Sequence, residues 1–477
     1  MAPHESVVTR TLKRLFDSTK GLLGFLPYRR SSPMSRNRRE LLAGIALAGV
    51  LLAGCLDEGD ASGDDGDPDE PTPSSGTPAV GNPNVDEPTL SAVVADNTAF
   101  ALDLHRELVD YEPGENLFVS PYSISVALAM TWAGARGETA DEMAETLRFA
   151  VDQDDLHPAF AALQAELGER GADDEEEDQP FEFNDANALW GLDEYPYRES
   201  FLETTDEHYG AGLRTLDFAA DPEAARQEIN EWIETETEER IDELLPENSV
   251  DEDTRLVLTN AIYFLATWAK TFSEDATEDR PFTALDGSTA DVPLMSQSER
   301  FPYAEVDGHQ VIELPYVGEE VGMVVILPAA GEFETVEQEL DGERLAELFD
   351  ALDDREGRIE LPRFEFESGV DLSETLAGMG MPTAFEEGAA DFSGMADPEA
   401  AGEGLFIGGV YHDAFVAVDE EGTEAAAATG VVMQPDSAPL DPFEMTVDRP
   451  FLFAIRDRPT DAILFLGRVV DAPAAQG

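Results

Sequence analysis

A run of small side chains from Glu420 to Gly430, with the sequence EEGTEAAAATG, lies between two strand-like stretches, HDAFVAV and FEMTVDRPFLFAI. Four small residues recur at every second position and so share one face of an extended strand: Thr423, Ala425, Ala427 and Thr429. Gly422 supplies a hinge before them, and Glu424 is expected to point to solvent. A strand of this kind can slide between two existing strands, because that face buries no large or charged group.

Two other interpretations of this segment stay open. Alanine has the best helix propensity, so the run is also compatible with a plain alanine-rich helix. A flexible linker is the second alternative, although the strand-like flanks place the run between two ordered elements. The residues assigned to the inserting hinge are Glu420, Gly422, Thr423, Glu424, Ala425, Ala426, Ala427, Ala428 and Thr429.

The body of the chain, from about residue 93 to 473, mixes short helices with many strands and lacks a strict strand-helix alternation, which indicates an α+β fold. Apolar spacing predicts an amphipathic helix from Ser91 to Val109, and Ser-Pro at 120–121 starts an apolar helix that ends near Gly134. A further helix is predicted to begin around Thr139, where Thr139 and Glu142 have the spacing of a capping box.

Later stretches alternate in type. Strands are predicted for NDANALWGL, RLVLTNAIYFLATW and RIELPRFEFES, and helices for ARQEINEWIETETEERIDELL and EQELDGERLAELFDAL. HQVIELPYV with GMVVILP, and FLFAIRD with AILFLGRVV, are predicted antiparallel pairs.

The charge balance limits the partners. The chain has 103 acidic against 29 basic residues and a formal net charge of −74, so nucleic acid, which needs a basic footprint, is excluded as a partner. The acids are interleaved with apolar runs, and 42% of the residues are hydrophobic, which favours a folded, carboxylate-coated protein over a disordered chain. We therefore expect a salt-adapted, halophilic protein that unfolds at low salt.

The first 55 residues are predicted to be an N-terminal extension and an export signal. Paired Arg38 and Arg39 precede a short apolar stretch from Leu41 to Gly54 that ends at Cys55. Fourteen apolar residues are fewer than the ~20 that a spanning helix needs, so a permanent transmembrane helix is the weaker interpretation. The segment resembles a twin-arginine lipoprotein signal in which Cys55 is lipidated, and an ordinary buried thiol is the alternative.

Residues 56–92 are rich in Asp, Gly, Pro and Ser and are expected to form a disordered acidic linker between the signal and the body. The acidic run from Asp173 to Asp178 is interpreted as a surface loop insertion, with calcium binding as the alternative.

The body resembles the serpin family over nearly its whole length. The matches occur in serpin order: NLFVSPYSIS with ALAM, NALW, INEWIETET, LVLTNAIYF with Trp268, IELPY, LPRFEF, GM with DFSGM, DEEGTEAAAATG, and RPFLFAI with FLGRVV. The resemblance implies about nine helices packed on three β-sheets and an exposed reactive-centre loop at about residues 420–443.

By this resemblance, the protein is a protease inhibitor and not an enzyme. A target serine protease, or a cysteine protease, cleaves the loop and stays covalently bound while the loop inserts into the main sheet. We expect an extracellular, cell-surface monomer attached to the membrane only through its lipid. The alternative is a non-inhibitory surface lipoprotein of the same fold that binds another molecule.

The resemblance also assigns individual residues. Counting from Gly422 places the cleaved bond between Asp436 and Ser437, while the other candidates are Met433, Gln434 and Leu440. Three residues match a polar shutter beneath the strands that part, and a fourth lies at the top of the opening: Ser123, Asn260 and His412, with Trp268. Ordinary core packing is the other interpretation of these four residues.

The sequence shows no sign of a cofactor or a metal site, since the six histidines lack HExxH or similar spacing. A hydrolase with a Ser-His pair is disfavoured, because no nucleophile-elbow motif occurs and His412 has no local acid to orient it.

Overall fold

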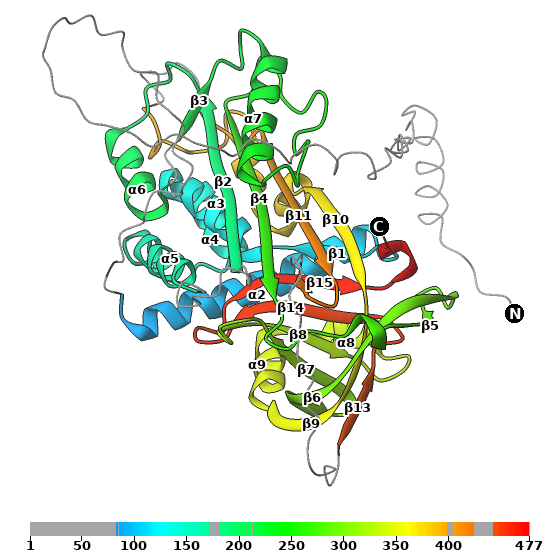
Figure 1. Cartoon of the computed structure of the whole chain (residues 1–477). Helices are drawn as coiled ribbons and strands as arrows, with labels where there is room; N and C mark the ends of the chain where they lie inside the picture. The colour runs from blue at the N-terminus through cyan, green and yellow to red at the C-terminus, as the bar shows by residue number, and fades with distance from the viewer. Residues whose placement is uncertain are drawn as a thin grey trace, which may run out of the picture. The chain divides into compact units, whose positions relative to one another are not determined.

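A computed structural model of the chain describes residue 83 and residues 85–170, 181–210, 213–397, 404–423 and 442–476. Within these residues the chain forms two β-sheets covered by helices (Figure 1). This architecture confirms the predicted α+β class.

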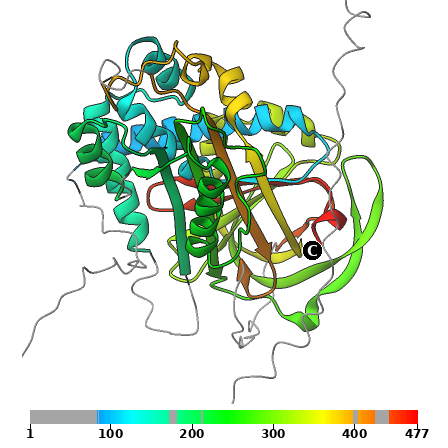
Figure 2. The same cartoon turned by 90° about the horizontal axis from the view of Figure 1, so that it is seen from above.

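The smaller sheet has six strands in the order β10-β11-β12-β4-β2-β3, and Figure 2 shows its long strands side by side from above. Its strands are β2 (Phe181–Leu192), β3 (Arg214–Leu216), β4 (Leu256–Thr267), β10 (Phe364–Asp371), β11 (Gly409–Val418) and β12 (Gly422–Thr423).

The larger sheet has nine strands in the order β1-β15-β14-β8-β7-β6-β9-β13, with β5 paired to β6. Its strands are β1 (Leu117–Val119), β5 (Glu278–Thr283), β6 (Thr289–Val306), β7 (His309–Pro315), β8 (Val321–Leu327), β9 (Asp353–Pro362), β13 (Phe443–Thr446), β14 (Phe451–Asp457) and β15 (Ile463–Val469). The predicted pairs β7–β8 and β14–β15 are antiparallel, as expected.

The three expected sheets are joined into two in the described part of the chain. The eighteen-residue β6 pairs with β5 at its start, with β9 along its middle and with β7 at its end. One long strand thereby connects two sets of strands into a continuous hydrogen-bonded sheet.

Nine α-helices lie within the described residues. They are α2 (Glu87–Tyr111), α3 (Pro121–Gly134), α4 (Gly137–Thr146), α5 (Gln153–Gly168), α6 (Glu199–Tyr209), α7 (Pro222–Glu236), α8 (Phe333–Glu339), α9 (Gly342–Asp350) and α10 (Ser373–Met379). In this part of the chain, no helix combines the length and the apolar character that crossing a bilayer requires.

The six-stranded sheet is buried on both faces because its residues alternate between two cores. On β4, Leu258 and Ile262 belong to the main core, which also contains much of α3, whereas Val257 and Ala261 pack with the apolar residues of α7. Asn260 follows the period of Leu258 and Ile262, so its side chain is on the α3 side of the sheet.

Thr139 and Glu142 do not form the predicted capping box. Helix α4 begins at Gly137, and its first residue is preceded by Arg136, which makes no side-chain cap. The Thr139 hydroxyl instead accepts the backbone N–H of Asp391 at 2.9 Å, and the Glu142 carboxylate accepts the N–H of Thr383 at 3.0 Å. Both side chains therefore hold a segment more than 240 residues away in sequence.

Four predicted elements differ in extent. The helix predicted for ARQEINEWIETETEERIDELL is α7, which ends at Glu236 and leaves the last nine residues of that stretch outside it. The first helix begins at Glu87, before the Ser91 start that apolar spacing indicated, with Asp86 as its N-cap. The helix predicted for EQELDGERLAELFDAL is two helices, because the Asp341 side chain caps a new helix by accepting the N–H of Arg344. The strand RIELPRFEFES is interrupted at Arg363, so that β9 and β10 belong to different sheets.

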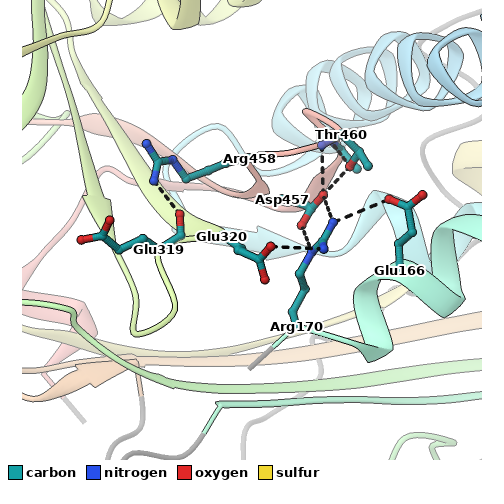
Figure 3. A network of polar contacts seen from close by, with 8 residues as sticks. Glu166, Arg170, Glu319, Glu320, Asp457, Arg458 and Thr460 are labelled. Atoms are coloured by element: carbon teal, nitrogen blue, oxygen red, sulfur yellow. Dashed lines mark hydrogen bonds and ion pairs between the residues drawn. The ribbon is translucent and has the colours of Figure 1, made fainter. Parts of the chain in front are cut away.

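Arg170, just after α5, connects this helix to the end of β14 in the nine-stranded sheet (Figure 3). Its guanidinium donates to the fully buried carboxylate of Asp457 at 2.7 Å and lies near Glu320 and Glu166. Asp457 also accepts the Thr460 hydroxyl at 2.6 Å, which orders the turn between β14 and β15. The end of α5 is thus attached to the nine-stranded sheet at two hairpin turns, the β7–β8 turn and the β14–β15 turn.

Candidate functional site

The candidate site is the boundary between β11 and β4, which we call the seam. The two strands run parallel and pair directly over six residues, from Gly409 opposite Val257 to Ala414 opposite Ile262. Above this stretch, β12 lies between them: Thr423 pairs with Val418 of β11 and with Ala266 of β4. The seam is therefore closed along one half and already parted along the other.

A tight turn from Asp419 to Gly422 brings the chain back into the sheet. The Asp419 carboxylate accepts the N–H groups of Glu421 at 2.8 Å and Gly422 at 3.1 Å, and the Asp419 N–H donates to the Gly422 carbonyl. Self-bonding of this kind is characteristic of Asp at the start of a turn. The hinge Gly422 and the first residue of the predicted inserting face, Thr423, therefore already lie within the sheet.

Gly422 is required at its position by close packing. A Cβ atom there would lie 2.1 Å from the carbonyl oxygen of Ala266 and 2.8 Å from the Cα of Thr267. Both atoms belong to the backbone of β4, which cannot move aside independently of the sheet. The expected hinge glycine is therefore the residue that lets β12 approach β4.

The Thr423 side chain faces the core and is almost fully buried. Its hydroxyl lies 2.7 Å from the hydroxyl of Tyr316, a fully buried residue whose pKa is raised by that burial, so the phenol stays protonated. Trp268 stacks on the Tyr316 ring with centroids 4.5 Å apart. The Trp268 indole N–H donates to the carbonyl of Asp419 at 3.0 Å, which fixes the turn above the parted seam.

Glu420, in the turn before β12, is held by Arg363. The Arg363 guanidinium donates to both carboxylate oxygens at 2.5 and 2.6 Å, and the Thr277 hydroxyl donates to one of them at 2.5 Å. Burial raises the pKa of Glu420, but the hydrogen bonds from Thr277 and Arg363 outweigh it, so the pKa lies below its ordinary value. Glu420 is therefore an ionised anchor for the turn.

A polar cluster lies under the closed half of the seam. Asn187, Asn260 and His412 sit in one row across β2, β4 and β11, as the strand registers place them opposite one another. The Asn260 amide donates to the Ser123 hydroxyl at 2.6 Å, and Ser123 donates to Asn187 at 2.8 Å. Ser123 enters from the first turn of α3, which begins at the Ser120 N-cap.

His412 links the two sides of the seam. Its Nδ1 is hydrogen-bonded to the side-chain oxygen Oδ1 of Asn260, while its Nε2 accepts the backbone N–H of Ser120 at 3.1 Å. Because Nε2 accepts, the proton lies on Nδ1 and the ring is neutral. Burial lowers the pKa of His412 to about 3, which agrees with this tautomer.

The structure therefore brings together Ser123, Asn260 and His412, and it places Trp268 at the parted end of the seam, beside Glu420, Gly422 and Thr423. The remaining hinge residues lie outside the described residues, as do the cleavage candidates Met433, Gln434, Asp436, Ser437 and Leu440, and Arg38, Arg39 and Cys55 of the signal.

The sequence analysis did not single out three further residues of the site: Asn187, Tyr316 and Arg363. Asn187 and Tyr316 lie inside the motifs NALW and IELPY, so the motif positions were visible while their contacts with the seam were not. Arg363 follows Pro362 between two strands, and its partner Glu420 is 57 residues away.

The arrangement does not support hydrolysis at His412. The residue is fully buried, and both ring nitrogens are engaged, one with Asn260 and one with the Ser120 backbone. The Ser120 hydroxyl donates to the Leu464 carbonyl at 2.7 Å instead of to a histidine. Within the described residues, no group of three or more His, Cys, Asp or Glu side chains is placed to hold a metal.

Comparison with known proteins gives a family match. The model of the family described as Serpin (serine protease inhibitor) matches residues 95–472. Bovine leukocyte elastase inhibitor is 42% identical over 385 residues, covering 79% of this chain and 98% of that protein.

Solved structures agree with this match. The native state of tengpin, a thermophilic serpin, has a TM-score of 0.71 and 28% identity, covering 82% of this chain and 96% of tengpin. Human thyroxine-binding globulin complexed with thyroxine has a TM-score of 0.70 and 30% identity, covering 80% of this chain and 99% of that chain.

Proposed function

The chain belongs to the serpin family, and from this premise we propose that it inhibits an extracellular serine or cysteine protease as a suicide substrate. The observation that carries the proposal is the half-parted seam, in which Gly422 and Thr423 are paired with β4. A loop strand that has already entered the sheet at one end needs only to continue along the same boundary.

Continued register supports insertion through the closed half of the seam. Gly422 lies opposite Thr267, and Thr423 lies opposite Ala266. Because this pairing is antiparallel, each following residue of the loop would lie opposite the preceding residue of β4. Insertion to Thr429 places this residue between Asn260 and His412, which now face each other. Insertion to Thr429 replaces three of the six direct residue pairs between β11 and β4, those at residues 412–414, and insertion to Val432 replaces all six with two antiparallel ladders.

The side chains on the inner face suit this movement. Thr423 shows which face enters the core, and by the period of two Ala425, Ala427 and Thr429 follow it. Alanine adds apolar burial with no polar group to desolvate, while Thr429 brings one hydroxyl to the polar cluster. That hydroxyl is able to accept the proton of His412 Nδ1 and donate to Asn260, so the bond broken by insertion is remade on both sides.

The covalent step takes place on the loop. The catalytic oxygen or sulfur of the protease attacks the carbonyl carbon of the cleaved bond, forms an ester or thioester with it, and releases the new amino terminus. Our candidate is the bond between Asp436 and Ser437, with Met433, Gln434 and Leu440 as the other positions. Insertion of the amino-terminal half then carries the attached protease away from the loop's original place before water hydrolyses the acyl bond.

We further propose export by the twin-arginine route and lipid attachment at Cys55, so that the inhibitor acts as a monomer at the outer surface of a salt-adapted cell. The supports are the Arg38-Arg39 pair, the apolar stretch that ends at Cys55, and the net charge of −74. The predicted end of the linker at residue 92 is wrong, because α2 begins at Glu87. The linker that precedes α2 would hold the domain away from the membrane.

A non-inhibitory binding protein is the second candidate. It is favoured by one neighbour, thyroxine-binding globulin, which has the same fold and was solved with thyroxine bound. We favour inhibition because the half-parted seam offers a slot for the chain's own loop, which binding a ligand does not require.

A denaturing gel distinguishes them. The full chain is mixed, in molar salt, with a panel of serine and cysteine proteases of different specificity. We expect an adduct that survives denaturation with at least one protease, and mass spectrometry of the released carboxyl-terminal peptide identifies the cleaved bond. Cleavage in the loop without any adduct, across the whole panel, would support the non-inhibitory alternative instead.

A further inference from the structure

His157 is a buried histidine, and one of its ring nitrogens has no hydrogen-bond partner among the residues that the structure describes. The residue lies on α5 and is 4% exposed, and its Nδ1 lies 2.6 Å from the hydroxyl of Tyr209 on α6. Its Nε2 is buried and unpaired within the described part of the chain. An orphaned buried polar atom costs about 1–3 kcal/mol, so the position calls for a ligand that the nitrogen can bind.

A second imidazole lies beside it. The His208 ring, also on α6, is 6.3 Å from the His157 ring, centroid to centroid, with an interplanar angle of 21°. The two helices are neighbours in the helical layer, where α5 and α6 pack against each other (Figure 1). His208 is only partly buried, so the second ring of the pair is reached by solvent.

Both rings are available as ligands. Burial lowers the pKa of His157 to about 4, with a further decrease from the nearby His208. Burial also lowers the pKa of His208, against the opposing effect of Glu207. At neutral pH both imidazoles are therefore uncharged, which is the form that coordinates metals.

We propose that His157 and His208 bind one transition-metal ion of the Zn²⁺, Cu²⁺ or Ni²⁺ class and so connect α5 to α6. Imidazole nitrogen suits these ions, whereas the carboxylates that coat this protein prefer Mg²⁺ and Ca²⁺. With the ion on Nε2, His157 Nδ1 carries the proton and donates it to the Tyr209 oxygen, an outer contact that orients the ring.

The site has two protein ligands, and water completes the coordination. No third His, Cys, Asp or Glu joins them in the part of the chain that the structure describes. The affinity is accordingly below that of a three- or four-ligand structural site. Binding stabilises the folded protein, since the unfolded chain holds the two histidines 51 residues apart without a fixed geometry. This inference does not depend on protease inhibition.

The test is a calorimetric titration of the full chain with Zn²⁺ in molar KCl with excess Mg²⁺, which occupies the carboxylates. We expect one equivalent to bind and the unfolding temperature to rise. His208→Gln should weaken binding at least tenfold and remove the thermal shift, whereas His309→Gln, on the nine-stranded sheet, should change neither. Co²⁺ absorption should show nitrogen ligation in the wild type and lose it in His208→Gln.

The half-exposed His208 is the primary variant because His157→Gln alters a buried position and risks misfolding. Equal Zn²⁺ affinity in His208→Gln and the wild type overturns the proposal. Absence of saturable binding to the wild type also overturns it, and would leave a buried water as the partner of His157 Nε2.

Discussion

The hydroxyls of Tyr316 and Thr423 lie 2.7 Å apart at the parted end of the seam, both buried in the core. Tyr316 comes from the end of the β7 strand region and Thr423 from the returning loop, so this contact joins the nine-stranded sheet to the loop that we propose to insert. Because both side chains are buried, a charged side chain at position 423 would lose its hydration without a partner in the core.

Thr423→Arg should convert the inhibitor into a substrate. A guanidinium at this position would have to be buried against the Tyr316 and Trp268 rings, so the loop cannot follow β12 into the seam before the acyl bond is hydrolysed. The measurement is the adduct gel, in which the cleaved form should replace the adduct.

Glu424→Arg is the matched control for that experiment. By the period of two it places the same side chain on the opposite face, next to Thr423, where no burial is required. Inhibition should persist in this variant. Full inhibition by Thr423→Arg would contradict the insertion mechanism, and loss of inhibition in both variants would indicate an effect on protease recognition.

Gly422→Ala should destabilise the seated turn by roughly 2 kcal/mol or more, because the new methyl group meets the β4 backbone. Hydrogen exchange should accelerate at the Trp268 amide, which donates to the Glu421 carbonyl at 2.9 Å in the seated turn. Gly114→Ala is the control, since a Cβ there meets no atom within 4 Å. Unchanged exchange at Trp268 would show that β12 tolerates a side chain at residue 422.

His412 should make stability fall with acid. Its folded pKa of about 3 is below the ordinary value of 6.5, so the unfolded chain binds a proton that the folded protein does not. The contribution is complete above pH 6.5 and decreases by about 1.4 kcal/mol per pH unit as the pH falls towards 3.

The comparison of wild type with His412→Gln isolates this effect, because His157 and other titrating groups are common to both proteins. The variant loses the bond to the Ser120 backbone and should be less stable by about 1–3 kcal/mol near neutral pH. The difference should shrink as the pH falls below 6.5 in denaturant titrations. Parallel curves would show that His412 does not titrate between the two states.

Low salt should unfold the protein. With a net charge of −74, carboxylates repel one another over the Debye length, which is ~10 Å at 0.1 M salt and ~3 Å at 1 M. The unfolding temperature followed by circular dichroism should therefore rise steeply from dilute buffer to molar KCl. Equal melting in the two conditions would remove the interpretation of the acidic surface as an adaptation to salt.

Local periodicity was sufficient to predict most of the strands and to predict which side chains of β4 face the core at the seam. The alternation of β4 places Asn260 on the core side from sequence alone, and the helix at Pro121 follows from its Ser120 cap. Motif order was sufficient to bring Ser123, Asn260 and His412 into one cluster.

Long-range contacts decided the remaining features. Thr139 and Glu142 have capping-box spacing, but they bind the backbone of Asp391 and Thr383, which no local pattern contains. The role of Gly422 depends on the position of the Ala266 carbonyl, and the break at Arg363 depends on which sheet each half of the strand joins. Such features follow from tertiary packing, which the order of residues does not display.

The two loop residues that already lie between β11 and β4 have a kinetic consequence. Starting a new strand is the slow part of strand addition, because the first residues lose conformational freedom before the hydrogen bonds of the ladder form and stabilise them. If the loop inserts as we propose, this nucleus is present before cleavage. The competition between insertion and deacylation then begins at the propagation stage, and its outcome depends on how quickly the six residue pairs of the closed boundary exchange partners.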